Sequence, residues 1–184
     1  MKELIKRNLD GKKILFLFIV TNIVYVIMLT ITIPKVMGFA GGMKLLDMIP
    51  SGYTPEYVNT LLNALGAAGR HAYLFNQIPV DMVYPFLFGV SNCLVLAYFL
   101  NKLGKFNSNL FYLCLLPIFA GLFDYCENIG IIIMLTSFPG NSILLSQVTN
   151  VFSILKSAFT TTYFIVLIIS LIMFGTNKLF RKST

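Results

Sequence analysis

Several residue types are scarce in this chain of 184 residues, and each shortage removes a class of function. The chain has no tryptophan, one histidine and three cysteines, and only 11% of its residues are charged. Soluble domains carry about a quarter charged residues, so the composition excludes an ordinary soluble globular protein. The hydrophobic fraction of 57% predicts an integral membrane protein instead.

The cysteines and the missing catalytic motifs narrow the chemistry further. Cys93, Cys114 and Cys126 fall inside apolar runs and show no C-x-x-C spacing, which argues against a disulfide framework, a zinc site or a thiol redox centre. There is no H-E-x-x-H, G-x-S-x-G, Walker A or glycine-rich dinucleotide motif. These signatures hold metals, nucleophiles and nucleotides, so we predict no metal and no cofactor.

Long apolar runs are what the chain does contain. Four of them could each cross a bilayer, over about residues 14–33, 79–100, 110–136 and 149–175. Residues 35–78 form one long loop, in which Thr54, Pro55 and Glu56 are a helix start signal. We therefore predict one all-α domain over residues 1–184: a polytopic membrane four-helix bundle with an outer-face amphipathic helix at about 55–68.

Prolines are expected to set the boundaries of the first two spans. Pro34 should end the first span, and Pro79 should begin the second, because proline is tolerated in the first turn of a helix and breaks its interior. The helix from Pro55 to Gly69 is expected to lie on the outer membrane surface or to cover the mouth of the bundle.

The distribution of positive charge predicts the orientation. The net charge is +7, but no basic domain is present, so nucleic acid is not an expected partner. Lys35, Lys44 and Arg70 lie on the outer side of this topology. Ten basic residues lie on the inner side: Lys2, Lys6, Arg7, Lys12, Lys13, Lys102, Lys105, Lys178, Arg181 and Lys182. The positive-inside rule then places both termini in the cytoplasm of a multi-pass cell-membrane protein, with a bacterial inner membrane as the expected location.

Ionisable side chains inside the spans are the strongest functional signal. Asp124 and Glu127 lie in the third span and Lys156 in the fourth. At ~1.5 Å per residue, Glu127 and Lys156 lie at similar depths, roughly 10 to 14 Å below the outer boundary, so they can meet. Charges at such depth are costly and usually serve a site. We predict these three as the catalytic group, with the acids exchanging protons; plain structural pairing is the alternative.

A wider ring of polar residues is predicted to bind the ligand. Two acids and one lysine leave one negative charge in excess, which Arg70 could balance, with Asp81 competing for it. The predicted ligand-binding set is Arg70, His71, Tyr73, Asp81, Tyr84, Asn128, Ser153 and Thr160. Each also has an ordinary interpretation: solvated loop residues, an interfacial tyrosine belt, or polar contacts between helices.

Two resemblances accompany these residues. One is carried by the segment 46–54, Leu65-Gly66, Gly69-Arg70, Asp81, Tyr84-Pro85, Phe123-Asp124 and Glu127-Asn128. This pattern resembles one in uncharacterised four-helix bacterial membrane proteins, and it brings no activity with it. The second is an analogy of topology: four helices, a long first outer loop and embedded carboxylates resemble the emopamil-binding and sigma-2 receptor family. That family binds sterol-like amines, and some members isomerise sterols by proton transfer. The absence of tryptophan and of a match to its helix 2 acidic motif departs from it.

Together these observations favour an outward-opening polar pocket between the second, third and fourth spans. We expect it to bind a lipophilic or amine-bearing small molecule, with proton-transfer chemistry left open. Membrane lipids are expected partners, and a homo-oligomer is left open. The alternatives are a proton-coupled carrier or transporter subunit, and a structural membrane partner without a ligand. A cavity lined by the ionisable residues would favour ligand binding, whereas a dry ion pair would favour the structural role.

Overall fold

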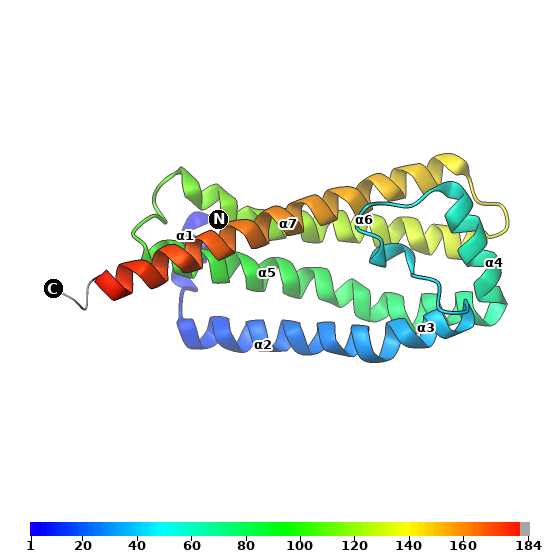
Figure 1. Cartoon of the computed structure of the whole chain (residues 1–184), viewed down its shortest axis with the longest axis horizontal. Coiled ribbons are helices and arrows are strands. Elements are labelled where there is room, and N and C mark those ends of the chain that lie inside the picture. Colours follow the sequence, from blue (N-terminus) through cyan, green and yellow to red (C-terminus); the bar gives the residue numbers. More distant parts are fainter. Residues whose placement is uncertain (181–184) are drawn as a thin grey trace.

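Four long helical segments make up the protein (Figure 1). The computed structural model describes residues 1–180, and across that range it contains helices and loops without strands. The segments Gly11–Phe39, Pro55–Lys102, Asn109–Ser137 and Ile143–Asn177 are long and apolar enough to cross a membrane. The prediction of an all-α membrane four-helix protein is confirmed. Arg181 and Lys182 of the predicted basic tail lie outside the described residues.

The first segment does not stop at Pro34. After the short helix α1 (Lys2–Arg7), helix α2 (Gly11–Ile27) is capped by the Asp10 carboxylate, which accepts hydrogen bonds from two backbone amides of its first turn. A π-helical turn, η1 (Met28–Thr32), then leads directly into α3 (Ile33–Phe39), whose first turn contains Pro34. A widened turn relieves the clash between a proline ring and the preceding carbonyls. The expected helix end at Pro34 is therefore wrong.

The second segment also contains a π-helical turn directly before a proline-containing turn. Helix α4 (Pro55–Ala72) is followed by a second π-helical turn, η3 (Tyr73–Gln77), which leads into α5 (Ile78–Lys102) with Pro79 in its first turn. Residues predicted as a separate loop helix and second span thus form one helical run. The run bends at Gly66, whose φ of 59° is a left-handed conformation that suits glycine. Helix α4 lies across one end of the bundle, which we call the loop end (Figure 1).

The third and fourth segments pack tightly on each other. Helix α6 (Leu116–Ser137), preceded by the 3₁₀ turn η4 (Asn109–Leu115), lies between α5 and α7 (Ile143–Phe180). Helix α2 packs mainly on α5. Small residues allow the close contacts: a Cβ placed on Gly121 would lie 2.7 Å from the Pro85 carbonyl oxygen. Small residues are typical of such contacts between membrane helices.

Residues 40–54 fold back into the loop end of the bundle. The segment contains a 3₁₀ turn, η2 (Leu46–Met48), and Leu46 is fully buried. Three hydrogen bonds hold it: Tyr57 Oη donates to the Lys44 carbonyl (2.8 Å), Tyr73 Oη donates to Asp47 Oδ1 (2.8 Å), and the Tyr53 amide donates to Asn150 Oδ1 (2.7 Å). Leu45, Leu46 and Tyr53 of this segment are therefore packed in the core, whereas its turns at Gly41 and Pro50 are exposed.

We expect Gly121→Ala to destabilise the protein by about 1–3 kcal/mol, because the added methyl group meets the rigid backbone of α5. Thermal unfolding in detergent measures the effect. Gly175→Ala is the matched control, since no heavy atom lies within 4 Å of its added Cβ and alanine favours a helix over glycine. Equal Tm values for the two variants would contradict the close approach of α5 and α6.

Candidate functional site

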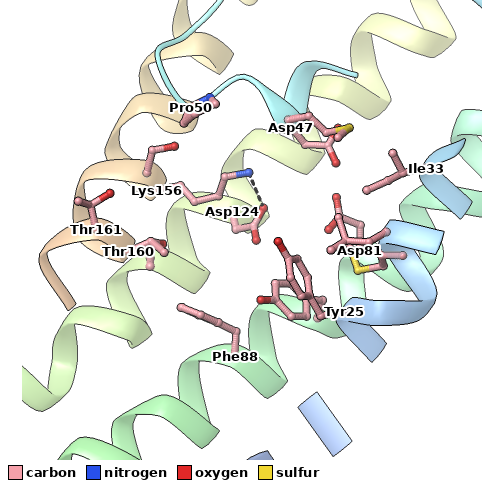
Figure 2. Close-up of a pocket in the computed structure, with 16 residues that line it drawn as sticks. Tyr25, Ile33, Asp47, Pro50, Asp81, Phe88, Asp124, Lys156, Thr160 and Thr161 are labelled. Atoms are coloured by element: carbon pink, nitrogen blue, oxygen red, sulfur yellow. Dashed lines mark hydrogen bonds and ion pairs between the residues drawn. The ribbon is translucent and has the colours of Figure 1, made fainter. Parts of the chain in front are cut away.

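Lys156 on α7 joins the two acids of α6 (Figure 2). Its Nζ lies 3.3 Å from Asp124 Oδ1 and forms a second ion pair with Glu127 Oε2. The two acids are three residues apart, so they lie about 60° apart on the helix and can reach the same neighbour. All three side chains are largely or fully buried. The structure thus brings together the predicted catalytic residues, whose catalytic role stays a prediction.

A cavity of about 370 Å³ lies beside this ion pair. Its size falls in the range of small-molecule sites. Residues from all four helical segments line it. The predicted pocket between the last three spans therefore left out the first segment. The cover of the cavity also differs from the expectation. Residues Asp47, Met48 and Pro50 close it at the loop end, and none of its lining residues comes from α4.

Carboxylates outnumber cations in this cavity. Asp47, Asp81 and Asp124 line it, with Lys156 as the cationic member among its lining residues. Figure 2 shows the three aspartates around one space, reached from the loop, α5 and α6. Glu127 is not a lining residue and lies behind Asp124, paired with the same lysine. If all four acids are ionised, the group carries a formal excess of three negative charges.

Asp81 is the acid with the least compensation. Only 3% of its surface is exposed, and its Oδ2 has no hydrogen-bond partner within the described residues. By contrast, Asp124 contacts Lys156, and Asp47 accepts a hydrogen bond from Tyr73. A buried carboxylate without a partner is energetically costly, so Asp81 is the position at which an added proton or cation is most favoured. The acids are not spaced as a metal site anywhere in the described part of the chain.

The other predicted ligand-binding residues on α5, α6 and α7 divide into cavity walls and supports. Tyr84 and Thr160 line the cavity, and Tyr84 stacks on Tyr25 with ring centroids 5.3 Å apart. Asn128 supports it from behind, because its Nδ2 donates to the Asp81 carbonyl oxygen at 3.1 Å. Ser153 is buried, and its Oγ has no hydrogen-bond partner among residues 1–180.

Arg70 and His71 do not join the site, and Tyr73 joins it indirectly. Arg70 donates to the Leu62 carbonyl at 2.8 Å, beside the bend at Gly66, and its guanidinium lies 4.5 Å from the Phe138 ring centroid. The expectation that Arg70 balances the acids is therefore wrong: a carbonyl near a helix break and an aromatic face hold it elsewhere. His71 is exposed against Phe75. Tyr73 is fully buried and acts through Asp47.

Sequence reasoning missed Asp47, Tyr25 and Tyr53. Asp47 was assigned to a surface loop, although the apolar residues around it are a signal of burial. Tyr25 lies in the first span, which the sequence analysis did not include among the helices around the pocket. Tyr53 is buried near the acids, and its burial, followed by the negative charge of Glu127, raises its pKa above the usual value. Its hydroxyl therefore stays protonated and available as a donor.

Comparisons of the chain with protein-family models, with curated proteins and with solved structures found no match. The function is therefore argued from the site itself, which is in any case a firmer basis than fold alone.

Replacing Lys156 by methionine is expected to destabilise the protein by about 3–5 kcal/mol, because Asp124 and Glu127 would remain buried without their cation. The apparent Tm in detergent measures this loss. Adding Asp124→Asn and Glu127→Gln to the same chain should restore most of it, since the uncompensated charges are then absent. Lys35→Met, at an exposed position, is the control. An unchanged Tm in the single Lys156 variant would contradict a structural role for the ion pairs.

Proposed function

We propose that this protein binds a lipophilic amine in the cavity, with the ammonium group between Asp81 and Asp124. The observation that carries this proposal is the charge of the lining: three aspartates face a cavity of ligand size that contains one lysine.

The positive charge of the ligand follows from the pairing of the acids. Lys156 already contacts Asp124 and Glu127, whereas Asp81 has no cation among its described neighbours. An ammonium group would supply the missing charge and donate hydrogen bonds to Asp81 Oδ2. Charge-assisted hydrogen bonds of this kind are about twice as strong as neutral ones. An anionic ligand would instead meet the repulsion of several carboxylates.

The lipophilic character follows from the remaining walls. Met28, Leu29, Ile33 and Phe88 line the cavity with apolar side chains. Tyr25 and its stacked neighbour on α5 add aromatic faces, which attract ammonium groups and pack against apolar skeletons. A few polar groups on one side and apolar groups elsewhere are the usual composition of a small-molecule site.

Proton exchange with the bound amine is the chemistry that this site would support. Asp124 lies in the lining and shares Lys156 with Glu127, so a proton taken up at one carboxyl changes the pairing of the other. Acids coupled through one lysine can give and accept protons in a water-poor site. Asp81 would contact the ligand, whereas Glu127, which does not line the cavity, would take part in the proton exchange through the shared Lys156.

We expect an amine to bind at least about tenfold more tightly than its matched alcohol, a difference of ~1.4 kcal/mol. Dodecylamine and dodecanol, titrated against purified protein in detergent by calorimetry, measure the difference. Asp81→Asn should remove the preference for the amine while leaving the Tm close to that of the wild type. Glu56→Gln, at an exposed position on α4, should keep it. Equal affinity for amine and alcohol in the wild-type protein would contradict the proposed function.

We also propose that both termini face the cytoplasm of a bacterial cell, which leaves the loop end outside. The ten inner basic residues against three outer ones support this orientation. A fluorescent protein fused after Thr184 should then fluoresce, and alkaline phosphatase inserted after Gly140 should be active in the periplasm. The opposite pair of results would reverse the assignment.

A further inference from the structure

The shape of the cavity identifies where its ligand comes from. We propose that the ligand is a single-chain, phosphate-free long-chain amine dissolved in the bilayer, and that it enters sideways between α2 and α7 and leaves its chain in that gap. This inference rests on the proposed function, and it adds the source, the route and the chemical class of the ligand.

A packed segment covers the cavity at the loop end, and only Pro50 among its three lining residues there is exposed. Asp47, Met48 and Pro50 cover it there, and the segment that carries them is held by the hydrogen bonds of Tyr57, Tyr73 and Asn150. Leu45 and Leu46 of this segment are fully buried. A water-soluble amine that approached from this end would have to displace an anchored and packed segment.

The opposite end of the cavity is closed by the core of the bundle. Phe88 lies at that boundary and packs edge-on against Tyr163, with ring centroids 6.2 Å apart. The Tyr163 hydroxyl donates to Asn92 Oδ1 at 2.9 Å, and Leu96 beyond it is fully buried. This layer spans α5 and α7 and leaves no continuation of the cavity among the lining residues.

The side between α2 and α7 is the open one. In Figure 1 α5 and α6 lie between these two helices, and α2 packs mainly on α5 while α7 packs mainly on α6. Three lining residues on this side are exposed: Tyr25 by 41%, Leu29 by 40%, and Thr161 on α7. Tyr25 and Leu29 are one turn apart, so they form one edge of an opening that faces away from the core.

The surroundings of this opening are hydrocarbon. Large apolar side chains are exposed beside it on both helices, including Val26 on α2 and Ile165 on α7, as expected for lipid-facing surfaces. A ligand that enters here must be soluble in the membrane, and an apolar chain left in the gap would replace lipid against these walls. A phospholipid does not fit, because its phosphate would follow the amine towards Asp81 and Asp124.

A photolabelling experiment tests the route. The protein in phosphatidylcholine nanodiscs is exposed to a sixteen-carbon primary amine that carries a diazirine at mid-chain, and to the matched alcohol. We expect amine-specific adducts within residues 25–33, which run from the end of α2 through η1, and within residues 157–165 of α7, and their loss in Asp81→Asn. Adducts of the amine that depend on Asp81 but lie on residues 44–57 would overturn the sideways route and leave the proposed function intact. Equal labelling by amine and alcohol in the wild-type protein would overturn both.

Two bulky substitutions test the opening itself. Leu29→Trp and Thr161→Trp each place a large side chain in the gap from one edge, and we expect each to reduce amine-specific labelling at least fivefold. Ile23→Trp is the matched control, because Ile23 is equally lipid-exposed on α2 but does not line the cavity. Variants are compared only where the Tm stays near the wild-type value. Undiminished labelling in both folded gap variants, or equal loss in the control, would overturn the inference.

Discussion

One ammonium group on α7 sets the arrangement of the acidic part of this bundle. Lys156 reaches Asp124 and Glu127 across the interface with α6, in a segment where isolated charges are costly. Because both acids depend on this lysine, α6 and α7 are held at one relative rotation and depth. That register places Asp124 at the cavity and turns Glu127 to the rear. The remaining acids, Asp47 and Asp81, approach the same space without a cation of their own, which gives the cavity its negative character.

Two prolines and one glycine position the rest of the site. The π-helical turns η1 and η3 each come directly before a proline-containing first turn, so the helices continue where a break was expected. The turn η1 contributes Met28 and Leu29 to the cavity wall. The bend at Gly66 directs α4 across the loop end, where Tyr57 and Tyr73 hold the returning loop that carries Asp47. Local backbone adjustments therefore determine which side chains meet.

The cavity lies between two kinds of environment. Its loop end is covered by a segment that hydrogen bonds and buried leucines hold, and large apolar side chains are exposed beside its flank between α2 and α7. Such a site suits molecules with a charged head and an apolar body, because the carboxylates receive the head while the body keeps contact with hydrocarbon. The ion pairs of Lys156 are compatible with a structural role at the same time. Lys156 thus pairs two of the acids across α6 and α7, whereas Asp81 lies at the same cavity without such a pair.

The sequence by itself determined the fold class, the approximate spans and the convergence of Asp124, Glu127 and Lys156. These follow from rules that act locally: an apolar run of sufficient length crosses a bilayer, and charges at equal depth pair with each other. Only the tertiary structure decided that Asp47 belongs to the site, that Arg70 does not, and that the first span forms a wall. The course of a loop and the choice of partner for a long side chain depend on contacts between residues distant in sequence. Helical periodicity carries no information about those contacts, whereas the packed bundle determines them.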